Sequence, residues 1–272
     1  MLDWLLDPFS GALMQRALIE VLVIAIACGP LGVWILLYRQ SYAAESISHA
    51  MLPGLVVASL AGASLLLGAA AGVLVAAVAI ALAGRDERLG GDVGVAVAIS
   101  ALSGLGALLA LSPDVPARLG ELLFGDLLGV TGTDIAEAAI LAGGIALALV
   151  AGHRRFALSV FDRAAAPSLG ARPGYWELAL LVLLAICTVA AVQGLGNLLV
   201  VALILAPAAA ALNFAQRLGT ALVLSAGLAG LAGVLGLLAS YHWGVAAGAS
   251  VALAAVALFL ASLAPRALDT QG

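Results

Sequence analysis

Long apolar segments, interrupted about every 20 residues by short polar or glycine-rich breaks, constrain this chain more than any other feature. A helix needs about 20 mostly apolar residues to cross the hydrocarbon core of a bilayer. Candidate spans lie at 12–38, 43–62, 63–84, 93–112, 131–152, 174–193, 195–213, 220–240 and 243–264. We therefore predict an all-α, polytopic membrane helical bundle of eight or nine spans, with residues 1–272 forming a single transmembrane domain.

The composition supports a membrane location and excludes several classes of protein. Hydrophobic residues make up 64% of the chain and charged residues 10%, whereas soluble domains contain about 25% charged residues. The chain has no lysine and its arginines are dispersed, so it lacks the basic patch of a nucleic-acid-binding protein. A Walker A phosphate loop also requires a lysine. We therefore expect a transport protein that is not an enzyme, with energy supplied by a partner or an ion gradient.

Arginine placement predicts the orientation, because cytoplasmic loops carry an excess of positive residues. If the loop at 153–173 is cytoplasmic, most arginines fall on that side and only Arg16 and Arg118 fall outside. This arrangement predicts an external N-terminus and a cytoplasmic C-terminus. The two cysteines, Cys28 and Cys187, lie inside apolar runs and are expected to be packing residues.

Two connections are longer than simple turns. Residues 113–130 fall on the external side and are predicted to hold a short amphipathic helix. On the cytoplasmic side, the segment at 156–172 contains Asp162, which can act near a helix N-terminus, and Gly170, which can end a helix. A short helix rich in small residues on this face would suit the docking of another protein, and an ordinary interfacial helix is the alternative.

Glu45 and His49 stand out in the stretch ESISHAMLPG because they are four residues apart in an otherwise apolar region. On a helix this spacing places both side chains on one face. Carboxylate and imidazole together suit Zn²⁺, Mn²⁺ and Fe²⁺. One helix supplies only two ligands, so two copies related by a two-fold axis would be needed to supply four. A Glu–His hydrogen bond without a metal is the alternative.

Other polar or helix-breaking residues near the spans have less specific interpretations. Pro53 and Gly54 follow the Glu–His pair by one turn and are expected to loosen the helix, which would allow hinge motion or a free carbonyl. Glu20, Glu137 and Glu177 lie nearer to span ends, where a solvated or hydrogen-bonded structural role is expected.

Four stretches, in order along the chain, resemble a known family. RQSYAAESISHAMLPG resembles the second-helix run of the zinc/manganese/iron ABC-importer permeases, which is typically GDxxSHAxLPG. ELLFGDLLGVTGTDI resembles the external segment of that family, and VFDRAAAPSLGA resembles its cytoplasmic coupling segment, normally FDPExARxLG. VQGLGNLLVVALILAPAAAA resembles the family run xQxVGxLLVxALLxxPAAxA. Together the four matches extend over nearly the whole chain.

The resemblance implies a permease subunit of an ATP-driven importer that moves divalent transition metal ions (Zn²⁺ or Mn²⁺, with Fe²⁺ as a further candidate) across the bacterial plasma membrane. It implies a homodimer in the lipid bilayer, two separate ABC ATPase subunits and an extracytoplasmic metal-binding protein. No permanent cofactor is implied, because the metal ion is the cargo and ATP is used by the partner.

The resemblance also implies roles for individual residues. Glu45 and His49 would be metal ligands, although the family usually has an aspartate at the first position. ATPase coupling is expected at Phe161, Asp162, Ala165, Leu169 and Gly170. Docking of the binding protein is expected at Asp114, Glu121 and Asp126. Pro167 stands where the family has a helix former.

Two other functions stay open at this point. A cobalamin or iron–siderophore ABC permease shares a related architecture, but its pathway needs room rather than ligands. A proton-coupled secondary metal transporter would use Glu45 and His49 as a proton relay and would work without an ATPase.

Overall fold

The computed structural model describes residue 4 and residues 7–83, 91–112 and 127–269, most of which are helical. The helices are η1 (Asp7–Ser10), α2 (Ala12–Leu37), α3 (Ser41–Ala50), α4 (Leu52–Leu60), α5 (Leu65–Ala83), α6 (Gly91–Ala110), α8 (Gly132–Phe161), α9 (Pro173–Leu195), α10 (Asn197–Phe214), α11 (Leu218–Trp243) and α12 (Ala247–Asp269). The described residues include no strand, so the all-α prediction is confirmed.

Within the described part of the chain, 6 segments are long and apolar enough to cross a bilayer. They lie in α2, in the combined α3–α4 segment, and in α8, α9, α11 and α12. Shorter apolar stretches occur in α5, α6 and α10, at Leu67–Ala76, Ile99–Ala110 and Val200–Phe214. The membrane bundle is thus confirmed, and the 6 spans found among the described residues differ from the eight or nine predicted. Helices α5, α6 and α10, which contain the shorter stretches, have 19, 20 and 18 residues.

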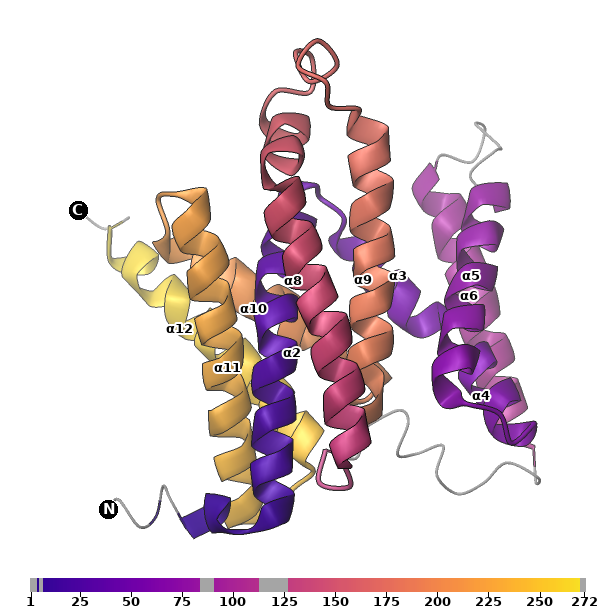
Figure 1. Cartoon of the computed structure of the whole chain (residues 1–272), viewed down its shortest axis with the longest axis vertical. Helices are drawn as coiled ribbons and strands as arrows, with labels where there is room; N and C mark the ends of the chain where they lie inside the picture. Colours follow the sequence, from indigo (N-terminus) through magenta and orange to yellow (C-terminus); the bar gives the residue numbers. More distant parts are fainter. Residues whose placement is uncertain (1–3, 5–6, 84–90, 113–126, 270–272) are drawn as a thin grey trace.

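The main bundle, which we define as α2 together with α8–α12, is arranged around α2 (Figure 1). Helix α2 packs against α8, α9, α10 and α11 and contributes many residues to the largest buried hydrophobic cluster. The packing is close enough that a Cβ on Gly32 would collide with the carbonyl oxygen of Ile204 and lie 2.9 Å from the Cβ of Ala208. Small residues permit this approach of helix backbones in lipid.

The second region, which we call the arm, consists of α3–α6 and lies beyond α9 from most of the main bundle (Figure 1). Helix α9 packs against α2 and α8 on one side and against α3 and α5 on the other, and α3 also contacts α10. The buried cluster that joins the arm to α9 is small and consists of Met51, Leu55, Ala69, Val189 and Val192. The arm is therefore attached to the bundle through far fewer buried side chains than those that hold the bundle together.

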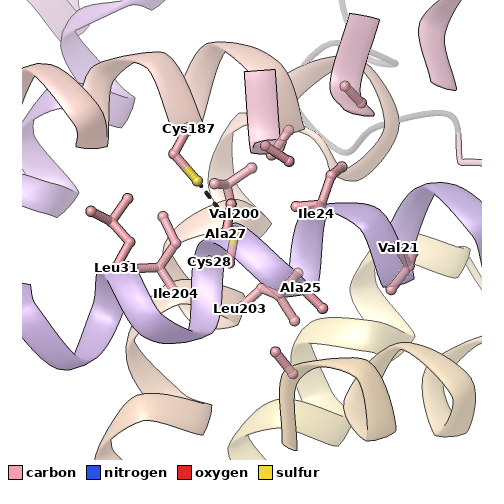
Figure 2. Packing of buried hydrophobic residues seen from close by; sticks show 14 of the residues in the cluster. Val21, Ile24, Ala25, Ala27, Cys28, Leu31, Cys187, Val200, Leu203 and Ile204 are labelled. Atoms are coloured by element: carbon pink, nitrogen blue, oxygen red, sulfur yellow. Dashed lines mark hydrogen bonds between the residues drawn. The ribbon is translucent and has the colours of Figure 1, made fainter. Parts of the chain in front are cut away.

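Cys28 of α2 and Cys187 of α9 meet inside the main bundle (Figure 2). Their Sγ atoms are 3.5 Å apart, and both residues are buried and free. Apolar side chains such as Leu31 and Ile204 surround them (Figure 2). The structure thus agrees with the interpretation as packing residues, and it adds a direct contact that the sequence did not predict.

The two ends of the bundle differ in the loops and arginines that they carry. The loop between α8 and α9 and the last turns of α12 lie at one end, which we call the loop end, and the start of α2 lies at the opposite end (Figure 1). Arg39, Arg163, Arg172 and Arg217 all adjoin helix termini at the loop end, whereas Arg16 lies in the first turns of α2. The start of α2 and the end of α12 thus lie at opposite ends of the bundle, and which end faces the cytoplasm stays a prediction.

Candidate metal site

Glu45 and His49 lie on α3, one helical turn apart, as the spacing predicted. Glu45 is exposed and His49 is half-buried, whereas Ala44, Ser46 and Ala50 on the other side of the helix are buried. Among the described residues, neither Glu45 nor His49 has a side-chain hydrogen-bond or ion-pair partner, so the alternative of a Glu–His hydrogen bond is not observed. The open face of α3 therefore presents a carboxylate and an imidazole together.

The helix that carries the pair is interrupted directly after it. Helix α3 ends at Ala50 and α4 begins at Leu52, with Pro53 in the first turn of α4. Proline has no N–H and cannot bond the carbonyl of His49 as a continuous helix would. The N–H of Met51 bonds that carbonyl instead. The interruption predicted at Pro53 is therefore present. The free carbonyl expected there is not observed at His49, and hinge motion of this segment stays a prediction.

Gly54, predicted as part of the hinge, has a packing role in this structure. A Cβ at Gly54 would collide with the carbonyl oxygen of Gly68 and lie 2.7 Å from the backbone nitrogen of Gly72, both on α5. Gly106 of α6 approaches the same segment, because a Cβ there would lie 3.1 Å from Cδ of Pro53. The segment that follows the pair is therefore seated against α5 and α6 with no room for an added methyl group.

The pair alone is an incomplete metal site. No group of three or more His, Cys, Asp and Glu that could hold a metal ion occurs among the residues described, and Zn²⁺ sites in proteins almost always have four ligands. The other histidines serve elsewhere: His153 lies edge-on to Trp34, with ring centroids 5.6 Å apart, and His242 stacks on Trp4 at 4.1 Å. The described residues of one chain thus offer two of the four ligands that such a site usually has.

The remaining acids near the spans differ in their surroundings. Glu137 is exposed and Glu177 is hydrogen-bonded, as predicted. The prediction for Glu20 was wrong: its side chain is buried, and its Oε2 has no hydrogen-bond partner among the described residues. The reason is that Glu20 lies on the face of α2 that packs against neighbouring helices, whereas Arg16 and Ile19 on its other face are exposed.

The predicted coupling segment forms consecutive hydrogen-bonded turns between α8 and α9. A carboxylate oxygen of Asp162 accepts a hydrogen bond from the backbone N–H of Ala165 at 3.0 Å, and Gly170 has a φ of 79° that favours glycine. The short helix that we expected is absent from this described segment, because Pro167 has no N–H to bond the carbonyl of Arg163. Asp162 and Gly170 nevertheless bound the turn where the sequence placed them.

The coupling segment also exposes apolar surface at the loop end. Phe161 is 66% exposed and Leu169 is 61% exposed, while Ala166 and Ala171 are fully buried and anchor the segment. The loop extends beyond the helices that flank it (Figure 1). This end of the molecule thus offers a raised, partly apolar contact surface.

A chain of polar contacts, which we call the polar link, joins the coupling segment to the helix of the Glu–His pair. Arg163 donates a hydrogen bond to Oε2 of Glu177 at 3.3 Å, and Gln40 donates one to Oε1 of the same carboxylate at 2.7 Å. Gln40 is the residue directly before α3, and its carbonyl accepts a backbone hydrogen bond from Ala44. Sequence patterns gave no signal for this link, because its three side chains come from segments far apart in the chain.

Tyr38 fixes the neighbouring end of α2 to α8. Its hydroxyl donates a hydrogen bond to the carbonyl oxygen of Phe156 at 3.2 Å. Burial raises the pKa of Tyr38 to about 12, so the hydroxyl stays protonated at neutral pH. The turn that carries Gln40 therefore begins from a fixed point on the main bundle.

The residues predicted to dock the binding protein, Asp114, Glu121 and Asp126, lie outside the described residues. Two nearby acids, Asp134 and Glu137, lie in the first turns of α8 at the end opposite the loop end. Asp134 belongs to a capping box with Thr131, which fixes the start of that helix.

The sequence matches the family described as the ABC 3 transport family over residues 10–266. This chain belongs to the ABC 3 transport family. The predicted resemblance to ABC-importer permeases is thereby confirmed, and the chain is a transport component.

Relatives within the family match over nearly their full lengths. The manganese import system permease protein ScaB of Streptococcus gordonii is 31% identical over 257 residues, which cover 93% of this chain and 92% of that relative. The chelated iron transport system membrane protein YfeD of Yersinia pestis is 30% identical over 257 residues, covering 94% and 86%. The solved structure of PsaBC from Streptococcus pneumoniae in complex with Fab has a TM-score of 0.88 at 31% identity, covering 97% of this chain and 95% of that chain.

Proposed function

We propose that this chain is the permease subunit of an ATP-driven importer of divalent transition metal ions in the bacterial plasma membrane, with Mn²⁺ or Fe²⁺ as the first candidates. Similar proteins are named for manganese or iron transport. Carboxylate and imidazole ligands suit both ions and also Zn²⁺, so the delivering protein and metal availability contribute to selectivity.

The single observation that carries the proposal is the open Glu45–His49 face on α3. A charged side chain facing lipid at the centre of a bilayer costs about 2.5–3.5 kcal/mol, so intramembrane acids face an interior or water. Glu45 is exposed in the isolated chain and has no described ion-pair partner. Its face of α3 therefore borders the metal pathway.

The missing ligands come from a second copy of the chain. Two copies related by a two-fold axis bring two Glu45 and two His49 side chains together, which gives four ligands around one ion. Cyclic dimers are the commonest arrangement of homo-oligomers. The metal is held only transiently, because movement of either copy separates the two half-sites.

An ATPase binds at the loop end, which we assign to the cytoplasm together with the C-terminus. Phe161 and Leu169 offer apolar contacts, and Asp162, Ala165 and Gly170 shape the turn that displays them. Motion of the loop reaches Glu177 through Arg163 and then reaches the start of α3 through Gln40. ATP hydrolysis on the partner thereby changes the geometry of the metal pair.

The opposite end receives an extracytoplasmic metal-binding protein. Asp134 and Glu137 lie at this end, at the start of α8. The sequence predicts that Asp114, Glu121 and Asp126 are also external, and together these acids would attract a cation. The released ion then passes towards Glu45 and His49.

The test compares metal accumulation in cells that express the complete transporter with wild-type chain, His49→Ala or Glu45→Asp. Manganese, iron and zinc are measured by elemental mass spectrometry, and each variant must reach the membrane and co-purify with the ATPase. We expect His49→Ala to reduce one metal to the level of cells without the transporter, and Glu45→Asp to retain uptake.

The matched control is His153→Gln, because His153 packs against Trp34 and lies outside the proposed pathway. Unchanged levels of all three metals in His49→Ala, with the ATPase still bound, would show that the pathway lies elsewhere. Uptake that persists without the ATPase would instead indicate a proton-coupled secondary transporter.

A further inference from the structure

A groove between α8 and α9 lies outside the proposed metal pathway. It has a volume of about 310 Å³ and is apolar along most of its wall. Its lining residues are Ala148, Phe156, Tyr175, Trp176, Leu178, Ala179, Val182 and Leu183. These residues come from the last half of α8 and the first half of α9, so the groove lies towards the loop end of the molecule (Figure 1).

The groove lies at the depth where a leaflet changes from hydrocarbon to headgroups. Helix α8 has 30 residues, which at 1.5 Å per residue makes it about 45 Å long, longer than the roughly 30 Å hydrocarbon core. The last turns of α8, including Phe156, therefore extend to the headgroup level. Ala148 on α8 and Leu183 on α9 lie deeper, so the groove leads from headgroups into acyl chains.

Aromatic rings form the outer part of the groove. The ring of Trp176 lies edge-on to Phe156 at 5.1 Å and to Tyr175 at 5.4 Å between centroids. Gly152 permits this arrangement, because a Cβ there would lie 2.7 Å from the Phe156 ring and 3.1 Å from the Trp176 ring. Trp and Tyr are the residues enriched at the membrane–water interface. The rings thus form a fixed rim at the headgroup level.

Two arginines at this rim provide positive charge without a neutralising partner. The Cζ atom of Arg155 lies 5.5 Å from the centroid of the Trp176 ring, and Arg172 directly precedes α9. Both side chains are exposed, and neither has a carboxylate partner among the described residues. The nearby carboxylate of Glu177 is bonded to Arg163 and Gln40. A cation–π contact leaves the edge of the Arg155 guanidinium free to donate to an anion.

We propose that this groove binds an anionic phospholipid from the leaflet at the loop end. One acyl chain lies along Ala148, Val182 and Leu183, and the phosphate accepts hydrogen bonds from Arg155 and Arg172. Basic pockets between transmembrane helices are suited to acidic lipid headgroups. The groove is apolar and ends at two arginines that have no described carboxylate partner. It therefore suits a lipid with a negatively charged headgroup better than a zwitterionic lipid, whose own positive group would be repelled. The inference does not depend on the proposed metal import.

The test uses the purified, detergent-solubilised transporter and the intrinsic fluorescence of Trp176. Dioleoylphosphatidylglycerol carrying bromine on its acyl chains is titrated into the protein, since bromine quenches a nearby indole. We expect saturable quenching that Trp176→Phe removes and that brominated phosphatidylcholine does not reproduce. Each arginine is expected to contribute about fivefold to affinity, so Arg155→Gln with Arg172→Gln weakens binding about 25-fold.

Two further variants separate charge from shape. Ala148→Phe leaves the charges unchanged and fills the deep part of the groove, and we expect it to abolish quenching. Arg217→Gln removes an exposed arginine at the same end but directly before α11, and we expect it to leave binding unchanged. Thermal unfolding of each variant, followed by size-exclusion chromatography, verifies that it is folded.

Several outcomes would overturn the proposal. Equal quenching by both lipids would show a nonspecific lipid contact, and displacement of the lipid by inorganic phosphate alone would show an anion site without a lipid groove. Unchanged binding in Ala148→Phe would place the lipid elsewhere. Quenching that appears only after the ATPase is removed would assign the groove to that protein. Failure of metal uptake in cells would leave all of these results unaffected.

Discussion

The main bundle and the arm are built from the same kinds of residues but are held together differently. Helix α2 lies among α8, α9, α10 and α11 and contributes to one large buried cluster. Among the described residues, the buried cluster that joins the arm to α9 has five members, and the helices of the arm approach one another at glycines such as Gly54, Gly68 and Gly72. The proposed metal ligands lie on α3, in the less firmly attached region.

This difference bears on the proposed mechanism, which needs one fixed region and one that moves. Regions with few buried apolar contacts open at low free energy, and moving elements are drawn from such regions. In the proposed mechanism the bundle is the fixed reference, and the arm carries the Glu45–His49 face that changes geometry during transport. The polar link from Arg163 through Glu177 to Gln40 crosses from the loop to the arm without passing through the bundle core.

The largest effect is expected from Gly32→Ala in the main bundle. The new methyl group would collide with the carbonyl oxygen of Ile204, and overpacking at such a site costs about 3 kcal/mol. We expect a large loss of folded protein, measured by thermal unfolding and size-exclusion chromatography. Gly227→Ala is the control, since a Cβ there meets nothing within 4 Å and alanine favours a helix by about 1 kcal/mol. A folded, fully stable Gly32→Ala protein would contradict the rigidity of the bundle.

The corresponding change in the arm, Gly54→Ala, is expected to act on function more than on stability. The methyl group would collide with the carbonyl oxygen of Gly68, and we expect the resulting shift of α4 to stay within the arm, because a small described cluster joins the arm to the bundle. We expect metal uptake to fall about tenfold, equivalent to about 1.4 kcal/mol, with an unfolding temperature close to wild type. Gly104→Ala on α6, which has open space around it, is the control. An equal loss of stability in Gly54→Ala and Gly32→Ala would remove the distinction between the regions.

The polar link is tested by Glu177→Gln and Glu177→Ala in reconstituted vesicles that contain the complete transporter. Glutamine keeps an acceptor for Gln40 but loses the ion pair with the exposed Arg163, so we expect about a twofold drop in metal moved per ATP hydrolysed. Alanine removes both contacts, and about a tenfold drop is expected. Arg154→Gln, which changes an exposed arginine without a described carboxylate partner, should have no effect. If wild type and the three variants all move the same amount of metal per ATP hydrolysed, coupling does not pass through Glu177.

The smallest effect is expected from Cys28→Ala. Removal of the buried sulfur leaves a small cavity beside Cys187 and costs about 1 kcal/mol. Because the two sulfur atoms are in contact, the double variant with Cys187→Ala should cost less than the sum of the single changes. Uptake per folded molecule should equal wild type. A loss of uptake at unchanged stability would mean that the cysteines act in transport.

Much of the architecture followed from local sequence features. Apolar length predicted the membrane helices, and the spacing of Glu45 and His49 predicted their shared face, because both depend only on residues near in sequence. Asp162 and Gly170 bounded the coupling turn for the same reason. The helix expected within that turn did not form, because Pro167 cannot donate a helical hydrogen bond even though its neighbours favour a helix.

Other features depended on contacts between distant segments. Burial of Glu20, the meeting of Cys28 with Cys187, and the bond from Gln40 to Glu177 each require helix packing that no local pattern encodes. The groove between α8 and α9 likewise exists only because those helices lie side by side. The sequence by itself thus determined the membrane class, the family and the shared face of Glu45 and His49, since hydropathy and short-range spacing are local. Only the tertiary structure decided which polar groups meet and which region is held loosely, since those follow from how helices pack.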